Sequence, residues 1–262
     1  MLRSFILLLS LISVTVLGAV IINCGSSSSG SAACTSGPYD VVGDWTLSSG
    51  DASGPGVINS SGLAVFFETT TTVPSPGNTV VMPSITGSCS FSGTATTYAT
   101  PAGGGGTTTV TVTGNVTSDT SIGGTVSNGS AFTLIPNSAL SSPPTALSGS
   151  MLGEIEGWTG TNIWQLSFSP TGAGSGMSFS GSDSSQGCIV SGTFNQEGGD
   201  LSTLNVFDVS ITYSGTGCPT TGTLSGIGFE SNTDYFSING NAQGVYLYAA
   251  SSAGAAVFEI YP

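Results

Sequence analysis

Two stretches of the chain share one pattern, Cys89-Ser90-Phe91-Ser92-Gly93-Thr94 and Cys188-Ile189-Val190-Ser191-Gly192-Thr193, and both read C-x-x-S-G-T. They begin 188 − 89 = 99 positions apart. At the same offset, segments 110–112 and 209–211 correspond, and in both of them apolar residues alternate with polar ones, as in half-buried strands. Matches that recur in the same order along a chain indicate a duplicated β unit.

Two weaker matches extend the pattern in both directions. Segment 124–127 (G-T-V-S) corresponds to segment 222–225 (G-T-L-S), and segment 41–45 resembles segment 151–155. A chain of 262 residues has room for two units of about 110 residues, each able to bury its own core. We therefore predict an all-β protein with two consecutive antiparallel β-barrel or β-sandwich units, at residues 39–145 and 146–262.

The expected strands are short and separated by turns rich in glycine and proline. In the first unit they are 39–47, 63–73, 79–86, 88–97, 107–117 and 123–135. In the second they are 147–156, 162–169, 177–180, 187–196, 204–214, 222–230, 233–239, 243–250 and 255–261. Glycines inside strands, such as Gly93, Gly192 and Gly226, are interpreted as bulges or bends that let a sheet close.

The charge composition excludes several classes of function. The chain has 14 acidic residues against one basic residue, Arg3, and it contains no histidine. Nucleic-acid binding is excluded, because it depends on lysine and arginine neutralising phosphates. Carboxylates surrounded only by like charges are expected to have raised pKa values, so the fold should tolerate acid.

The N-terminus has the pattern of an export signal. Arg3 precedes an apolar run that ends at Ile22, so residues 1–23 are predicted to be a signal peptide. The segment Ile21-Ile22-Asn23-Cys24-Gly25 resembles a bacterial lipobox, which implies that Cys24 is lipidated. Residues 24–38 are rich in serine and glycine and would form a flexible tether. A retained membrane helix and ordinary secretion are the alternatives.

Four further cysteines suggest disulfides in an exported protein. Cys188 and Cys218 lie in the same unit, and a bond between them would close a loop of about 30 residues and stabilise the fold by roughly 3–4 kcal/mol. Cys34 and Cys89 would then form the second pair. Free buried thiols remain the alternative, whereas the absence of C-x-x-C argues against redox chemistry.

Without histidine and lysine, the chain cannot assemble a serine or cysteine triad with a histidine base, a histidine-containing zinc site or a P-loop. Carboxylate chemistry remains possible. Glu154 and Glu156 would share a strand face about 7 Å apart, which suits acid/base work on a glycosidic bond. A solvent-facing strand edge that carries two acids is the favoured interpretation of this pair.

No metal site or cofactor is predicted. Asp183, and Glu197 with Asp200, stand in loops but lack the spacing of a calcium loop. Among the aromatic residues, Trp45 is expected to fill a core. Trp158, Trp164, Tyr246 and Tyr248 are interpreted either as core residues or as the lining of a binding mouth for sugar or lipid.

The second unit carries the resemblance to a family. Segment 181–193 (G-S-D-S-S-Q-G-C-I-V-S-G-T), segment 205–213 (N-V-F-D-V-S-I-T-Y), Cys218-Pro219 and segment 226–229 (G-I-G-F) are similar to segments of uncharacterised exported lipoproteins of proteobacteria and acidobacteria. The resemblance covers about the last 110 residues and implies a β domain with two cysteines, without any assigned activity. Separately, Gly43-Asp44-Trp45 resembles the G-x-W of the first lipocalin strand.

These observations favour a non-catalytic binding or structural lipoprotein, tethered to the outer membrane or cell surface of a Gram-negative bacterium. The periplasm and secretion are alternative locations. Its expected partners are the membrane, through the N-terminal lipid, and a cell-envelope glycan or a small apolar ligand. The alternative functions are a carboxylate-dependent glycan hydrolase and a small-ligand carrier with a lipocalin-like lumen.

Overall fold

The structure is a computed structural model. It describes residues 38–50, 52–68, 78–98, 106–138, 149–157, 160–171, 176–183, 187–197, 204–218, 221–231, 244–252 and 254–261. All of them belong to one compact unit that starts at Cys34. In these ranges the chain forms strands and turns, and it forms no helix. Accordingly, none of the described residues belongs to a helix with the length and hydropathy to cross a membrane.

Sixteen strands are formed by the described residues. They are β1 (Gly43–Ser49), β2 (Ala52–Ile58), β3 (Ala64–Phe67), β4 (Thr79–Met82), β5 (Ser90–Tyr98), β6 (Thr107–Ser118), β7 (Ser121–Val126), β8 (Ala131–Pro136), β9 (Gly149–Gly157), β10 (Gly160–Thr171), β11 (Gly176–Asp183), β12 (Cys188–Gln196), β13 (Phe207–Gly215), β14 (Gly222–Ser231), β15 (Gly244–Ser251) and β16 (Gly254–Tyr261).

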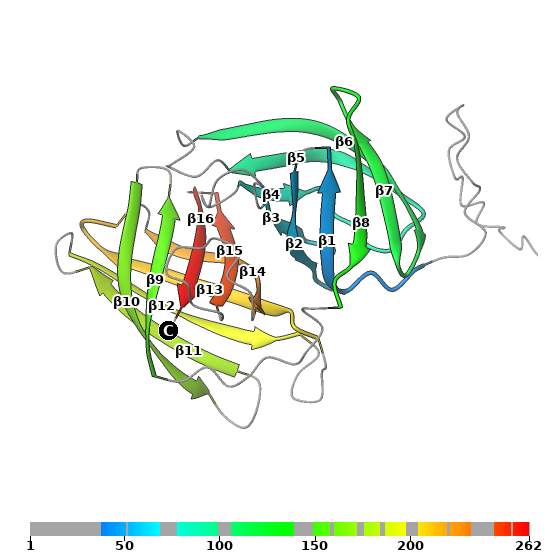
Figure 1. The fold of residues 1–262 in the computed structure, drawn as a ribbon. Coiled ribbons are helices and arrows are strands. Elements are labelled where there is room, and N and C mark those ends of the chain that lie inside the picture. Colours follow the sequence, from blue (N-terminus) through cyan, green and yellow to red (C-terminus); the bar gives the residue numbers. More distant parts are fainter. Residues whose placement is uncertain are drawn as a thin grey trace, which may run out of the picture. The chain divides into compact units, whose positions relative to one another are not determined.

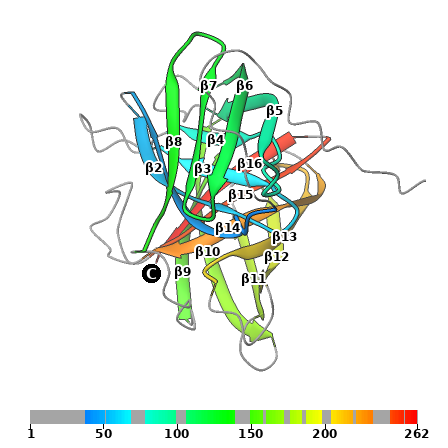
Figure 2. The same cartoon turned by 90° about the vertical axis from the view of Figure 1, so that its right-hand side faces the viewer.

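The strands close into two barrels, β1 to β8 and β9 to β16, coloured blue to green and light green to red in Figure 1 and Figure 2. Each strand pairs antiparallel with the next, and the pairs β1·β8 and β9·β16 close the two rings. Closure leaves no open sheet edge among the described strands. The expected all-β class is confirmed, while the expected boundary at 145/146 lies outside the described residues.

The matching segments of the two halves occupy different positions in the two barrels. C-x-x-S-G-T leads into or begins β5 and β12, which are the fifth strand of one ring and the fourth of the other. The matches that follow fall on β6 and β7, and on β13 and β14, with the same displacement. The segments starting at 41 and 151, by contrast, contribute to the first strand of each ring. Because both rings have eight strands, a duplication would have to include one strand change before the displaced strands and a compensating one after them.

Most of the expected strands are present within a few residues, and two expectations were wrong. The expected strand 123–135 is a hairpin of β7 and β8, and Gly129 in its turn has φ of 90°. Strand β2 was not expected, because its sequence A-S-G-P-G-V-I contains two glycines and a proline. The expected strand 233–239 lies outside the described residues.

Each barrel has its own packed interior. In the first barrel, inward residues such as Trp45, Phe66 and Phe132 form one buried cluster, and in the second barrel Phe179 and Phe194 belong to another. Trp45 is 3% exposed, as expected for a core residue, and its indole Nε1 donates to the Val41 carbonyl at 2.8 Å. An eight-stranded barrel is just wide enough for such side chains to fill it.

Glycine opposite phenylalanine is the recurring device that fits these rings into narrow barrels. Cross-strand pairs of this composition include Gly56–Phe66, Gly114–Phe91, Gly124–Phe132 and Gly192–Phe179. A Cβ atom at Gly124 would lie 2.7 Å from two ring atoms of Phe132. The ring therefore occupies the space that a side chain opposite would need.

The same geometry corrects the interpretation of strand glycines as bulges. Gly93, Gly192 and Gly226 all lie in unbroken register with their neighbours. A Cβ atom at Gly226 would lie 2.6 Å from the Cα atom of Ala249, and one at Gly93 would lie 2.7 Å from the Pro83 ring. These glycines permit close approach of a neighbouring chain segment, rather than an extra residue in the strand.

Candidate functional site

The two barrels contact each other through a third buried apolar cluster, which we call the junction. From the first barrel it takes Val57, Val65 and Phe67, and from the second Val206, Ile227, Phe229, Tyr246, Tyr248 and Ala255. The ring centroids of Phe67 and Phe229 lie 5.6 Å apart in an edge-on arrangement. Aromatic pairs in this geometry favour association beyond the area that they bury.

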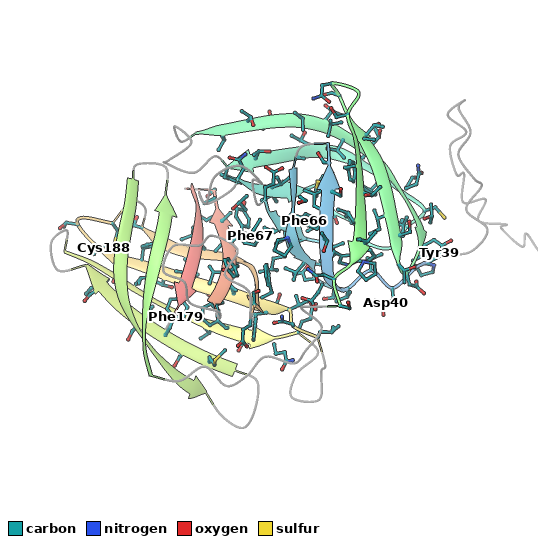
Figure 3. All side chains as sticks on the ribbon, viewed as in Figure 1. Tyr39, Asp40, Phe66, Phe67, Phe179 and Cys188 are labelled. Carbon is teal, nitrogen blue, oxygen red and sulfur yellow. A yellow bond between two sulfur atoms is a disulfide. The ribbon has the colours of Figure 1, made fainter. Side chains whose placement is uncertain are left out.

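Strand alternation explains how one short strand serves both the barrel interior and the junction. Phe66 and Phe67 are neighbours on β3, so they lie on opposite faces of the sheet (Figure 3). Phe66 belongs to the interior of the first barrel and Phe67 to the junction. All four residues of β3 are buried, because the strand is covered on both sides.

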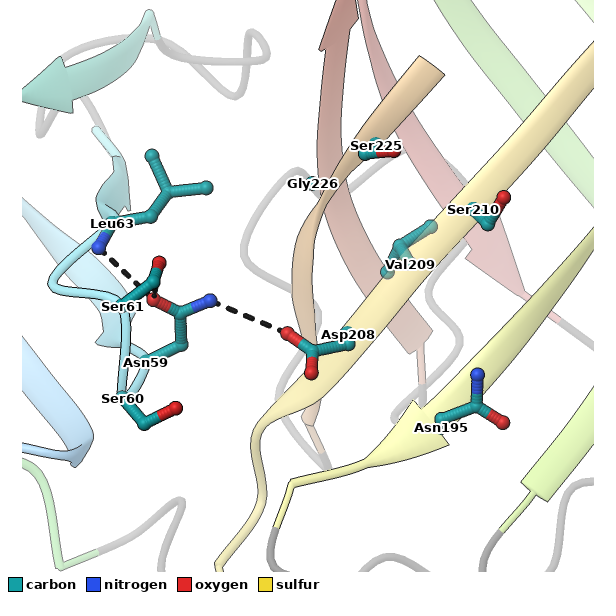
Figure 4. A pocket seen from close by; sticks show the side chains of 10 residues that line it. All are labelled: Asn59, Ser60, Ser61, Leu63, Asn195, Asp208, Val209, Ser210, Ser225 and Gly226. Atoms are coloured by element: carbon teal, nitrogen blue, oxygen red, sulfur yellow. Dashed lines mark hydrogen bonds between the residues drawn. The ribbon is translucent and has the colours of Figure 1, made fainter. Parts of the chain in front are cut away.

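Beside the junction lies a polar groove of about 400 Å³ (Figure 4). One wall is the loop between β2 and β3 of the first barrel, and the other is the outer face of β12, β13 and β14. The lining residues are Asn59, Ser60, Ser61, Leu63, Asn195, Asp208, Val209, Ser210, Ser225 and Gly226. Most of these residues are polar by type, but most of the surface that they expose in the groove is apolar, and the sequence supplies no basic residue to it.

Asn59 fixes the shape of the loop wall. Its side-chain oxygen accepts hydrogen bonds from the Ser61 hydroxyl at 2.7 Å and from the Leu63 backbone N–H at 2.9 Å. Gly62 has φ of 81°, a conformation that L side chains rarely adopt. The amide nitrogen of Asn59 then donates to Asp208 Oδ1 at 3.3 Å, which links the two walls (Figure 4).

Two further carboxylates accept hydrogen bonds between the barrels. Glu197 Oε1, after β12, accepts from the backbone N–H of Ser60 at 2.7 Å. Asp44 on β1 accepts from the backbone N–H of Asn205, which precedes β13. Burial raises the pKa of Asp44 from 3.8 to about 8, and the hydrogen bond from Asn205 opposes this shift only in part.

Glu68, which follows β3, shows the same influence of burial. Desolvation raises the pKa of its carboxyl group, and the hydrogen bond from the Asn78 side chain, at 3.2 Å, lowers it. The raised values expected from the acidic composition therefore occur in Asp44 and Glu68. Their cause is burial and not, as expected, repulsion between like charges.

The residues predicted as catalytic lie on the second barrel, whereas the loop that forms one wall of the groove belongs to the first barrel. Glu154 and Glu156 are on β9, where they pair with Glu259 and Val257 of β16. The register continues onto β15, where Tyr246 pairs with Glu259 and Tyr248 pairs with Val257. Glu259 is a third carboxylate in this register that the sequence did not suggest.

Other predicted residues are placed as follows. The disulfide between Cys188 and Cys218 is confirmed, whereas Cys24 and Cys34 lie outside the described residues, so the lipid and the Cys34–Cys89 bond stay predictions. Within the described ranges, no three His, Cys, Asp or Glu side chains gather in a way that could hold a metal ion. Glu197 instead bonds the loop of the other barrel.

The two tyrosines weighed as mouth or core residues are core residues, and they belong to the apolar cluster of the junction. Tyr246 and Tyr248 are 1% and 6% exposed, on the outer face of their barrel, and they are covered by the junction. The side chains of Trp158 and Trp164 lie outside the described part of the structure.

Sequence reasoning missed the groove residues Asn59, Asn195 and Asp208. Asp208 and Asn195 do fall on polar positions of alternating strands, as their cross-strand pairing requires. Nothing in the sequence, however, indicates that the Asn59 turn of the first barrel lies against them.

Comparison of the chain with known protein families, with curated proteins and with solved structures finds no match at a significant level. The geometry of the groove and the junction therefore carries the functional argument.

Proposed function

We propose that this chain is an exported, lipid-anchored protein that binds a neutral glycan segment, without catalysis, in the groove between its two barrels. The observation that carries the proposal is the lining of the groove. Amides, hydroxyls and one carboxylate, drawn from both barrels, surround a volume of about 400 Å³. That volume lies within the range of about 300–1,000 Å³ that is usual for ligand sites.

The chemistry of the lining favours a ligand rich in hydroxyl groups. Asp208 accepts from hydroxyls, and the Asn195 side chain offers both a donor and an acceptor. The hydroxyls of Ser210 and Ser225 do the same along the floor of the groove. An anionic ligand is disfavoured, because the chain carries a formal charge of −13 and would repel it.

The location forms part of the same proposal. The apolar leader and Cys24 support export and lipid attachment in a Gram-negative envelope, and the Cys188–Cys218 disulfide is consistent with an oxidising compartment. A tether at residues 24–38 would let the barrels reach envelope glycans from the membrane surface. The similarity of the second half to the first is proposed to reflect a duplication followed by two compensating strand changes.

The alternative functions remain distinguishable from this one. Buried side chains fill the described interior of both barrels, which favours binding outside the barrels over a lipocalin-like lumen. A glycan hydrolase would centre on Glu154 and Glu156, with Glu259 in register beside them. It would release new reducing ends, and a binding protein would not.

Calorimetric titration with neutral malto-, cello- and chito-oligosaccharides, and with anionic oligogalacturonides, tests the proposal. We expect saturable binding of at least one neutral series and none of the anionic one, with no new reducing ends. Ser225→Trp, which fills the groove, should weaken binding at least tenfold. Ser214→Trp is the control, since Ser214 is exposed on β13 and lies outside the groove lining.

The proposal is wrong if no neutral series binds, or if Ser225→Trp binds as well as the parent chain. Lipid attachment is tested separately by mass spectrometry of the mature N-terminus and by membrane fractionation. Cys24→Ala should move the protein from the membrane to the soluble fraction.

A further inference from the structure

Both carboxylates that accept backbone hydrogen bonds across the junction use one oxygen only. Asp44 accepts from Asn205 and Glu197 Oε1 accepts from Ser60. The second oxygens, Asp44 Oδ1 and Glu197 Oε2, are buried and have no hydrogen-bond partner among the described residues. A buried carboxylate with an unsatisfied oxygen is costly while it is charged, and a proton on that oxygen removes the charge.

Asp44 contacts a segment that is otherwise held by the second barrel. In this bridge segment, residues 204–206, the Leu204 carbonyl accepts from the Gln196 side chain at 2.7 Å, and the Val206 carbonyl accepts from the Glu197 N–H at 2.8 Å. The Asn205 side chain bonds both the backbone N–H and the carbonyl of Glu230. Asp44 is therefore the point at which β1 meets a rigid part of the other barrel.

Among the described residues, none carries a positive charge that could stabilise the anion of Asp44. Its partner on β2 is Val57, and its backbone carbonyl accepts from Asn137 after β8, so neither strand presents a titratable group to it. The bridge segment has none either. The titratable groups brought to the junction by the connected contacts are Glu197, Asp208 and Glu230, which are all acids, together with Tyr98 and Tyr248.

We propose that the junction is a proton-controlled contact, in which Asp44 takes a proton from solvent when the barrels pack together and returns it when they part. The groove walls belong to different barrels, so the same contact sets how firmly the groove is held. The inference goes beyond glycan binding and does not depend on it, because it concerns the bare protein.

Linkage fixes the direction and the size of the effect. Asp44 ionises near pH 4 when exposed and near pH 8 in the closed junction, so between these values opening releases one proton. The equilibrium constant for opening should then rise about tenfold for each pH unit from about pH 5 to about pH 7.5. Above about pH 8 it should level off, because both states are then ionised.

Amide hydrogen exchange of the full-length chain, corrected for intrinsic rates, measures this opening. The reporters are the amides of Asn205 and Ser60, which donate to Asp44 and Glu197, and the references are the interior amides of Val112 and Ile211. In the parent chain, the opening constant measured at the reporter amides should rise about tenfold for each pH unit, and the opening constant at the reference amides should not. Asp44→Asn, which is neutral and nearly isosteric, should abolish the slope.

Asp40→Asn is the control, because Asp40 is exposed beside β1 and its removal changes the net charge equally. It should behave as the parent chain. An unchanged slope in Asp44→Asn would overturn the proposal. An equal slope in the reference amides would also overturn it, because it would show an effect on the whole fold, and this comparison stands in the parent chain even if the variant does not fold.

Discussion

The hydroxyl groups of Tyr98, on β5 of the first barrel, and Tyr248, on β15 of the second, lie 3.1 Å apart. Their ring centroids are separated by 5.4 Å. Burial raises the pKa of Tyr248, and the hydrogen bond with Tyr98 raises it further. The contact thus joins the two barrels by a polar bond at the edge of the apolar junction, where water is largely excluded.

The tyrosine pair should behave as a unit in a double-mutant cycle. We expect Tyr98→Phe and Tyr248→Phe each to lower the free energy of unfolding by about 1 kcal/mol. The double variant should lose about as much as one single variant, because either change already removes the shared bond. Urea denaturation monitored by fluorescence measures the free energy of unfolding of the parent chain, the two single variants and the double variant. Strictly additive losses would contradict a hydrogen bond between the two hydroxyl groups.

Stability should fall as the pH rises from about 4 to about 8. The pKa of Asp44 is raised in the folded state. Between about pH 4 and about pH 8, Asp44 is therefore ionised in the unfolded chain but still protonated in the folded chain. The stability that is present in acid is lost as the pH approaches 8. Glu68 contributes in the same direction. The shift of Asp44 sets an upper limit of about 6 kcal/mol on its own effect.

Differential scanning calorimetry checks this dependence. The parent chain should have a higher Tm at about pH 4.5 than at about pH 8.5, and Asp44→Asn should narrow the difference by raising the Tm at the higher pH. Asp40→Asn again serves as the exposed control. A parent chain that melts at lower temperature in acid would refute the expectation.

Removal of the Cys188–Cys218 disulfide should destabilise the second barrel. The bond joins residues 30 positions apart, and Cys188 is 1% exposed within the barrel interior. For a loop of this length, the chain-entropy model gives a loss of about 3–4 kcal/mol. Denaturation of the Cys188→Ala/Cys218→Ala double variant, compared with the oxidised parent chain, measures the loss.

Peptide mapping without reductant shows whether the remaining cysteines pair as well. A peptide linking Cys34 to Cys89 would bear out the second predicted bond. If the Cys188→Ala/Cys218→Ala variant were as stable as the parent chain, the Cys188–Cys218 bond would contribute nothing to the stability of the fold, contrary to expectation.

Adjacent glycines on β7 should differ sharply in tolerance to substitution. A Cβ atom at Gly124 would clash with the Thr113 carbonyl oxygen and would lie 2.7 Å from the Phe132 ring, whereas one at Gly123 would meet only the Phe132 carbonyl oxygen, at 3.7 Å. Gly124→Ala should therefore destabilise by about 1–3 kcal/mol, the usual cost of overpacking. Gly123→Ala, on the opposite face, should change stability by no more than about 0.5 kcal/mol. Similar effects at both positions would contradict the Gly124–Phe132 packing.

Much of the fold could be predicted from local patterns. Strands such as 107–117 were predicted from the alternation of apolar and polar residues, because one face of the strand is buried and the other is exposed to solvent. The Cys188–Cys218 pair was predicted because both cysteines lie in one unit of a chain that was expected to be exported. Strand β2 could not be predicted, because Gly54, Pro55 and Gly56 lack strand propensity. Its glycines instead let β3 approach closely, which is a tertiary requirement.

The sequence by itself determined that this protein is built from strands and that Arg3 is its only basic side chain against 14 acidic ones. Both conclusions follow from the amino-acid composition and from the alternation of apolar and polar residues, which can be seen without knowing the tertiary structure. Only the tertiary structure decided which apolar faces meet. Phe67, Phe229 and Tyr246 have the same alternation as core residues, and nothing local distinguishes a barrel interior from a contact between barrels. The groove and the buried acid Asp44 exist because residues about 150 positions apart are brought together by that contact.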